Sequence, residues 1–249
     1  MKKLFNCVSI LLLFVSAEAS NSYTDLVEDG LISLDVKAAL HLGCGEVHLP
    51  GYINIDFPKK ERSLHSGSAA DYYCNITQLY FPKGSINKIE NHHVFEHFSR
   101  PVSLALLCAW SVWLCEEGTL VIETPDFEFA INRYQESNSF EERQVIIRHL
   151  FGSHEAAWAV HWDAWNKDKF SRILIALGFE IQNIQHSSWR STDNIQVIAK
   201  KIKTYSISEL KLIINNILKY SMVDASEALM LEIWQQDFEK ALYPMIESN

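Results

Sequence analysis

Two short segments of this sequence carry residue types that could hold a nucleoside. Gly43, Cys44 and Gly45 directly follow an apolar run at residues 38–42, and Asp56 ends the next run, residues 52–56. Glycines after a strand let the backbone approach a ligand closely, and a carboxylate at a neighbouring strand end can accept hydrogen bonds from both hydroxyls of a ribose. Either feature alone is weak evidence, because each is also common in ordinary turns. Together they favour a ligand-binding edge of a parallel sheet.

The elements that would position these residues alternate between short apolar runs and longer helical stretches, which is typical of an α/β sheet fold. We expect strands at residues 38–42, 52–56, 70–75, 86–91, 119–124, 179–185 and 195–200, and helices at 101–115 and 166–177. Residues 206–220 and 225–244 carry apolar side chains at helical spacing and predict two amphipathic helices. We favour packing of these helices against the flank of the domain over a dimer interface.

The composition is that of an ordinary globular protein, with 249 residues of which 48% are hydrophobic and 21% charged. Lys and Arg total 22 against 31 Asp and Glu, so the formal net charge is -9. Such a surface repels phosphates on average, and no long basic run compensates for it. Nucleic acid is therefore disfavoured as a partner.

The N-terminus has the three-part pattern of a secretory signal peptide. Lys2 and Lys3 precede an apolar run at residues 4–15, and Ala17-Glu18-Ala19 offers a cleavage site after Ala19. The alternative is a buried N-terminal helix, and we expect no membrane span in the mature domain. Cys7 lies within this segment, and the other four cysteines show no C-x-x-C spacing, which favours a reducing compartment. Export and cytoplasmic residence therefore both stay open.

The order of several segments resembles class I S-adenosylmethionine-dependent methyltransferases, in particular the compact group that reads LGCG followed by PGW-x-N-x-D. The similar segments are residues 40–45, 49–56, 81–89, 93–98, 117–126 and 161–179. The likeness covers about residues 37–201. It implies a Rossmann-like, mostly parallel seven-stranded sheet flanked by helices, with residues 204–249 as a C-terminal helical appendage.

The resemblance also implies S-adenosyl-L-methionine as the cofactor and gives roles to individual residues. Gly43, Cys44 and Gly45 would line its methionine and ribose part, and Asp56 would bind the ribose hydroxyls. Asn75 and Ile76 would flank the adenine ring. Asn91, His92 and His93 would lie under the reactive sulfonium.

Some positions depart from the family pattern. Asn75 and Asn87 stand where aspartates are usual, so a non-catalytic, cofactor-binding member of the fold remains an alternative. An amide at Asn75 could still bind the adenine amino group through its oxygen. The linker from Gly45 to Tyr52 is also shorter than an ordinary parallel crossover, and we expect a one-turn connection there.

Methyl transfer to oxygen or nitrogen also needs a base for the acceptor's proton. His97 and His161 are the candidate catalytic residues, and His154 is a third histidine nearby. The tryptophans of this region could wall an apolar or sugar-stacking pocket or simply pack in the core: Trp158, Trp162 and Trp165. The acceptor is unidentified and could be a small molecule, a sugar or a protein side chain. No metal ligand is assigned in this interpretation, and the oligomeric state stays open.

One rival interpretation uses the segment from His93 to His97, which also reads H-x-x-E-H, the inverted signature of zinc peptidases. On an α-helix, His93 and His97 would share a face as zinc ligands, with Glu96 as the base. An exported zinc metallopeptidase would suit the signal-like N-terminus. However, the helix expected at 101–115 carries no carboxylate for a third ligand, and Asp56 would be left without a role.

Overall fold

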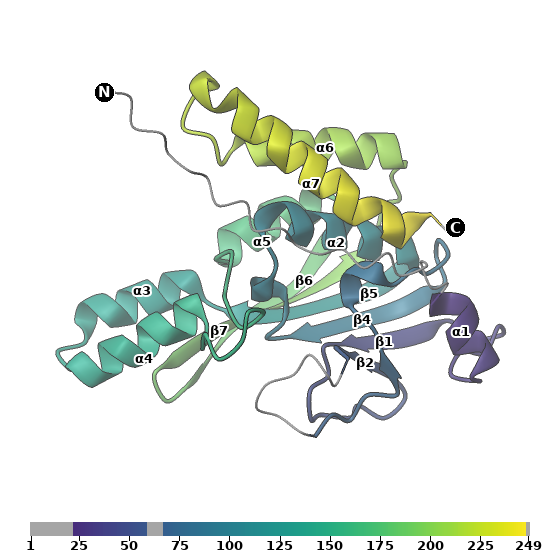
Figure 1. Ribbon diagram of the computed structural model, residues 1–249, viewed down its shortest axis with the longest axis horizontal. Helices are drawn as coiled ribbons and strands as arrows, with labels where there is room; N and C mark the ends of the chain where they lie inside the picture. Colours follow the sequence, from purple (N-terminus) through teal and green to yellow (C-terminus); the bar gives the residue numbers. More distant parts are fainter. Residues whose placement is uncertain (1–21, 59–66, 248–249) are drawn as a thin grey trace, which may run out of the picture.

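The computed structural model describes residues 22–58 and 67–247, which form a seven-stranded sheet covered by helices (Figure 1). The strand order is β3-β2-β1-β4-β5-β7-β6. The strands are β1 (Ala38–Leu42), β2 (Ile53–Asp56), β3 (Tyr72–Tyr73), β4 (Ile86–His92), β5 (Leu114–Pro125), β6 (Phe179–Trp189) and β7 (Thr192–Lys201). Only β7 runs antiparallel to its neighbours among these strands. The order of β3, β2, β1, β4 and β5 is that of doubly wound folds, which confirms the Rossmann-like sheet.

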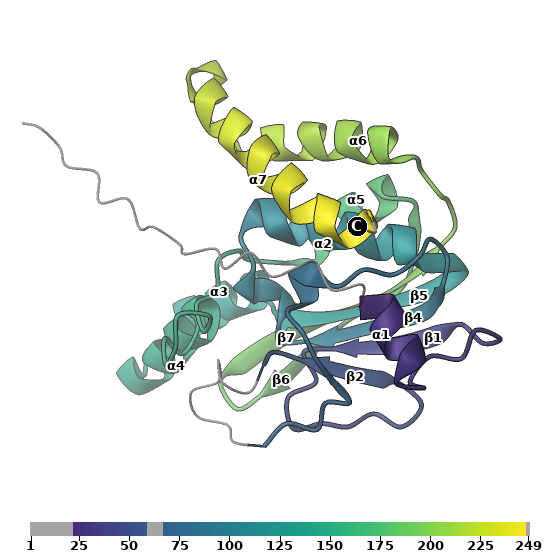
Figure 2. The same ribbon diagram turned by 45° about the vertical axis from the view of Figure 1, so that its right-hand side comes forward.

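The described helices lie in two groups. They are α1 (Ser22–Glu28), α2 (Arg100–Trp113), α3 (Phe127–Glu136), α4 (Phe140–Phe151), α5 (Lys167–Ala176), α6 (Ile207–Lys219) and α7 (Ala228–Ile246), with short 3-10 turns η2 (Ile76–Gln78), η3 (Phe95–His97) and η4 (Ala225–Glu227). In both views α2, α5, α6 and α7 lie on the same side of the sheet (Figure 2). The paired helices α3 and α4 project beyond it.

Local signals in the sequence set several helix ends. Asn166 caps α5, because its Oδ1 accepts a hydrogen bond of 2.9 Å from the backbone N–H of Lys169. Gly178 follows α5 in the left-handed region, at φ 87°, which only glycine adopts without strain. In α6, Ser206 and Glu209 form a reciprocal capping box.

Several element bounds differ from the expectation. The helix expected at 101–115 ends at Trp113, and β5 begins at Leu114, earlier than expected. Cys108 therefore lies on the helix and Cys115 on the strand. The strand expected at 70–75 is reduced to two residues. The short linker does join parallel strands, since Leu40 pairs with Ile53 and Leu42 with Ile55. It does so through turns, with no helix in residues 43–52.

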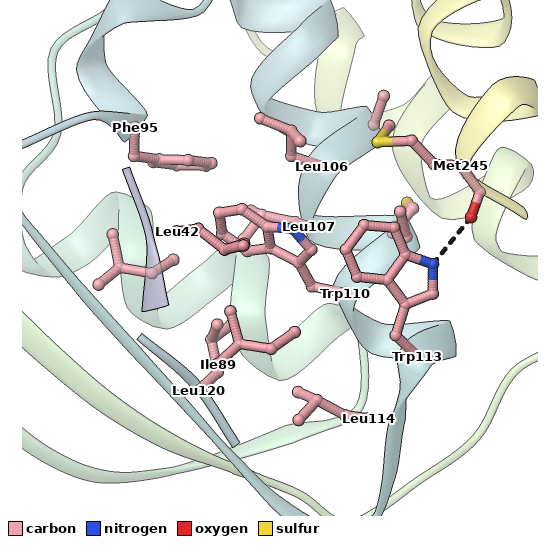
Figure 3. Close-up of a cluster of buried hydrophobic side chains, with 14 of the residues drawn as sticks. Leu42, Ile89, Phe95, Leu106, Leu107, Trp110, Trp113, Leu114, Leu120 and Met245 are labelled. Carbon is pink, nitrogen blue, oxygen red and sulfur yellow. Dashed lines mark hydrogen bonds between the residues drawn. The ribbon is translucent and has the colours of Figure 1, made fainter. Parts of the chain in front are cut away.

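The core joins the C-terminal helices to the sheet. Trp110 and Trp113 of α2 are fully buried against the strands, and Met245 of α7 is buried beside them (Figure 3). The indole Nε1 of Trp113 donates a hydrogen bond of 2.8 Å to the backbone carbonyl of Met245. Helix α7 thus packs on the domain's own α2. The division at residue 204 into a domain and an appendage stays a prediction.

None of the described helices combines the length and the apolar character needed to cross a bilayer. The signal-peptide-like segment, residues 1–19, lies outside the described residues.

Replacing Trp113 with Phe tests the link between α2 and α7. The substitution keeps most of the buried ring but removes the donor, leaving the carbonyl of Met245 without its partner. We expect the free energy of unfolding to fall by about 1–2 kcal/mol in urea titrations. The same change at exposed Trp189 is the control and should alter it by less than about 0.5 kcal/mol. Equal stability of both variants would show that this hydrogen bond does not hold α7.

Candidate functional site

A cavity of about 930 Å³ opens at the carboxyl ends of β1, β2 and β4. This volume is at the upper end of the usual range for small-molecule sites. Most residues implied for cofactor binding or catalysis border it: Gly43, Cys44, Gly45, Asp56, Asn75, Ile76, His92, His93 and His97. The exceptions are Asn91, His154 and His161. The sheet register explains the grouping, because Leu42 pairs with Ile55 on one side and with Asn91 on the other. Three strands therefore end side by side.

The glycine cluster forms a tight turn directly after β1. The backbone N–H groups of Gly43 and Cys44 both donate to the carbonyl of Ile55, at 2.8 and 3.1 Å. Gly43 has φ 74°, and a Cβ placed there would lie 2.3 Å from Cγ2 of Val94. Both its backbone angle and the closeness of Val94 therefore require glycine. The turn leaves room for a ligand, and a side chain at Gly43 would reduce that room.

Asp56 ends β2 beside this turn and is 6% exposed. Its Oδ1 accepts a hydrogen bond of 2.8 Å from the N–H of Phe57, and its Oδ2 accepts one of 3.0 Å from the hydroxyl of Ser68. Each carboxylate oxygen has two lone pairs, so the group can accept further hydrogen bonds from a diol. These bonds hold its orientation at the cavity.

Asn75 caps the turn η2 at the opposite wall. Its Oδ1 already accepts hydrogen bonds from the N–H and the hydroxyl of Thr77, at 3.0 and 2.9 Å. The oxygen expected to bind an adenine amino group would therefore have to share its lone pairs with Thr77. Ile76, the next residue, is 5% exposed and offers apolar surface to the cavity.

The floor of the cavity holds a network of two acids and two histidines that motif reasoning did not find. His92 lies 3.3 Å from Glu90 and 3.8 Å from Glu123, and His93 lies 3.2 Å from Glu123. The interactions with Glu123 and Glu90 raise the pKa of His92 to about 9, and the hydrogen bond to His92 is the main cause that lowers the pKa of Glu90 to about 2. Asn91 does not face the cavity, because its amide donates to the carbonyl of Leu42 at 2.9 Å.

The backbone at His93 removes the geometry that a zinc-peptidase motif needs. His93 is in the left-handed region, at φ 53°, and the helical turn η3 starts only at Phe95 and has 3-10 form. His93 and His97 therefore do not share a face of an α-helix. The imidazole of His93 instead pairs with Glu123 and lies 3.6 Å from Glu96. The expectation that His93 and His97 share a helix face as zinc ligands is therefore wrong.

The two candidate catalytic histidines lie together at the other end of the cavity. His97 borders the cavity, and its Nδ1 lies 3.2 Å from the carbonyl of Val160. His161 stands behind it, with ring centroids 4.7 Å apart, and its Nε2 is 4.0 Å from Oε1 of Glu96. Burial is the main cause that lowers the pKa of His161 to about 4.

The loop between α4 and α5 contributes one aromatic wall. Trp158 borders the cavity, whereas Trp162 is 63% exposed and Trp165 is buried and stacked on Phe170. His154 does not border the cavity, and its Nε2 lies 2.8 Å from the carbonyl of Phe151. Of the three tryptophans, only Trp158 is placed to contact a ligand in this cavity.

A His92→Gln variant tests the charge network on the cavity floor. The pKa of His92 is raised above its unfolded value near 6.5, so its contribution to stability is fully present below about pH 6.5 and is lost as pH rises through about 9. We expect the variant to be less stable by about 1–2 kcal/mol at pH 6, after allowance for solvent screening, and equal to wild type by pH 10. Denaturant titrations across this range measure it, with exposed His154→Gln as control. A stability difference independent of pH would contradict the ion pairing.

Comparisons with known proteins give a likeness of fold. No protein-family model and no curated protein sequence matches this chain. Among solved structures, it is similar to an S-adenosylmethionine-dependent methyltransferase from Methanosarcina mazei, with 13% identity, a TM-score of 0.44, and coverage of 72% of this chain and 98% of that one. It is also similar to magnesium protoporphyrin IX methyltransferase from Synechocystis PCC 6803 with bound S-adenosylhomocysteine, with 14% identity, a TM-score of 0.44, and coverage of 74% and 81%. A methyltransferase from Mesorhizobium loti gives 13% identity, a TM-score of 0.47, and coverage of 66% and 90%.

Proposed function

We propose that the cavity binds S-adenosylmethionine and that the protein is a methyltransferase that uses it. One observation carries this proposal: the glycine turn after β1 and the carboxylate of Asp56 after β2 face the same cavity of about 930 Å³. A close backbone and an acid on the neighbouring strand are what a nucleoside needs at the carboxyl edge of a parallel sheet. The cavity is also large enough for the whole cofactor together with part of an acceptor.

The bound cofactor would lie across the ends of β1, β2 and β4 and reach the segment after β3. Its methionine part would lie along residues 43–45, with the ribose on Asp56. The adenine would lie against Ile76 and Asn75, and the sulfonium would stand above the network around His92. The methyl group would then point toward the end of the cavity lined by Val94, His97, Phe98 and Trp158.

Methyl transfer from a sulfonium is an in-line displacement, so the protein mainly aligns the acceptor and excludes water. We assign activation of the acceptor to His97 and His161. His97 borders the cavity, and its Nδ1 must carry a proton to donate to the carbonyl of Val160, which directs the lone pair to Nε2. The acceptor is a small molecule, a sugar or a protein side chain. The acidic surface disfavours nucleic acid.

Calorimetry with S-adenosylhomocysteine tests the proposal directly. Wild type should bind, and Asp56→Ala should weaken binding by about 1.5–3 kcal/mol, because a charged hydrogen-bond acceptor is lost. Asp35→Ala removes an exposed acid outside the cavity and should bind as wild type does. Thermal melts of each variant separate a binding loss from unfolding. No binding by wild type, or equal binding by Asp56→Ala, would reject the site. Binding with no methyl transfer to any acceptor would instead favour the non-catalytic alternative.

A further inference from the structure

We propose that Glu96, His97 and His161 form a binding site for one divalent metal ion, and that zinc suits it best. Two imidazoles and one carboxylate are an established zinc ligand set that leaves a fourth position open. This set differs from the H-x-x-E-H motif, because His93 is not one of the ligands and the second histidine comes from a loop far along the chain. The existence of the site does not depend on the proposed methyl transfer, although its use does.

The three side chains already converge. Their potential ligand atoms all lie within 4.8 Å of one another. Ligands of a tetrahedral zinc ion are separated by about 3.3–3.5 Å, given zinc–ligand distances of about 2.0–2.2 Å. Side-chain movements of roughly 1 Å would therefore complete the coordination.

Two polar atoms of this cluster are buried without a hydrogen-bond partner among the described residues: Oε2 of Glu96 and Nδ1 of His161. The Glu96 side chain is only 3% exposed, and its ion pair with His93, at 3.6 Å, uses Oε1. Buried polar atoms are nearly always satisfied, so an orphaned carboxylate oxygen in a cluster with two imidazoles favours a bound cation.

The orientation of His97 is that of a metal ligand. Metal-binding histidines generally donate their second ring N–H to a carbonyl or carboxylate, which fixes the ring and its tautomer. His97 meets this condition through Nδ1 and the carbonyl of Val160. A second hydrogen bond, of 2.9 Å from the N–H of Trp162 to the carbonyl of Glu96, fixes the loop on which His161 lies. The two segments that supply the ligands are therefore held together without the ion.

The site lies at the end of the cavity where the proposed methyl acceptor would enter, since His97 borders that cavity. A zinc ion there would bind an acceptor oxygen or thiol and lower its pKa, so that the acceptor would lose its proton to water before it attacks the methyl group. His97 and His161 would then activate the acceptor by holding the ion. This role rests on the proposed function.

Zinc titration of chelator-treated protein, in competition with a zinc-sensitive dye, tests the site. We expect wild type to bind one ion per chain, and Glu96→Gln and His161→Ala to weaken binding by about 100-fold or more. His154→Ala removes an exposed histidine of the same loop and should bind zinc as wild type does. A cobalt(II) spectrum typical of tetrahedral coordination should be present in wild type and absent in His161→Ala.

Absence of zinc binding in wild type would overturn the proposal, as would unchanged binding in folded His161→Ala. Circular dichroism establishes that each variant is folded, and His161→Gln replaces any variant that is not. S-adenosylhomocysteine binding is measured on the same preparations. Loss of cofactor binding with zinc retained would reject the proposed function and leave the metal site standing, and the reverse result would reject only the metal site.

Discussion

The parallel pairing of β1 with both β2 and β4 is the constraint on which the rest of the site depends. Because Leu42 is level with Ile55 and with Asn91, the three strands end together, and the residues at their carboxyl ends face one cavity. A shift of one residue in either pairing would turn Asp56 or His92 to the other face of the sheet. The alternation along β2 fixes the register, because Ile53 and Ile55 join the hydrophobic core whereas Asn54 is hydrogen-bonded to His41 and Asp71.

Sequence reasoning predicted residues that the structure brings to one cavity, because the signals were local to strand ends. A glycine turn after one apolar run and an acid at the end of the next can be read without a three-dimensional structure. Glu90 and Glu123 were missed for the opposite reason. Each is a single acid within a strand. Glu90 lies two residues before His92 on the same face of β4, and only the pairing of β4 with β5, which sets His92 opposite Glu123, brings Glu123 to the histidines. The grouping of Glu96 with His161 likewise depends on how the loop after α4 folds back.

The errors in the predicted elements also have physical causes. The apolar run through α2 continues without interruption into β5, so nothing local marks the change at Trp113, and burial of both elements decides it. Helices α3 and α4 were not predicted, and each buries only one residue fully, Ala130 in α3 and Ile146 in α4. Their ends are set instead by the caps Asp126 and Ser139, which are short-range signals that need structural context to be distinguished from turns.

Unpaired acids on the cavity floor would oppose methyl transfer from a cationic donor, and the pairing of these acids with histidines removes that effect. Burial alone would lower the pKa of His93, but hydrogen bonds to Glu123 and Glu96 outweigh it and raise the pKa to about 10. Both histidines on the floor are thus cationic at neutral pH, and they offset Glu90 and Glu123. A sulfonium loses its charge as the methyl group leaves, so a floor with uncompensated negative charge would stabilise the ground state more than the transition state and slow the transfer. Paired charges give a polar, rigid floor that does not stabilise the ground state over the transition state. The network around His92 would therefore suit a sulfonium donor better than isolated carboxylates would.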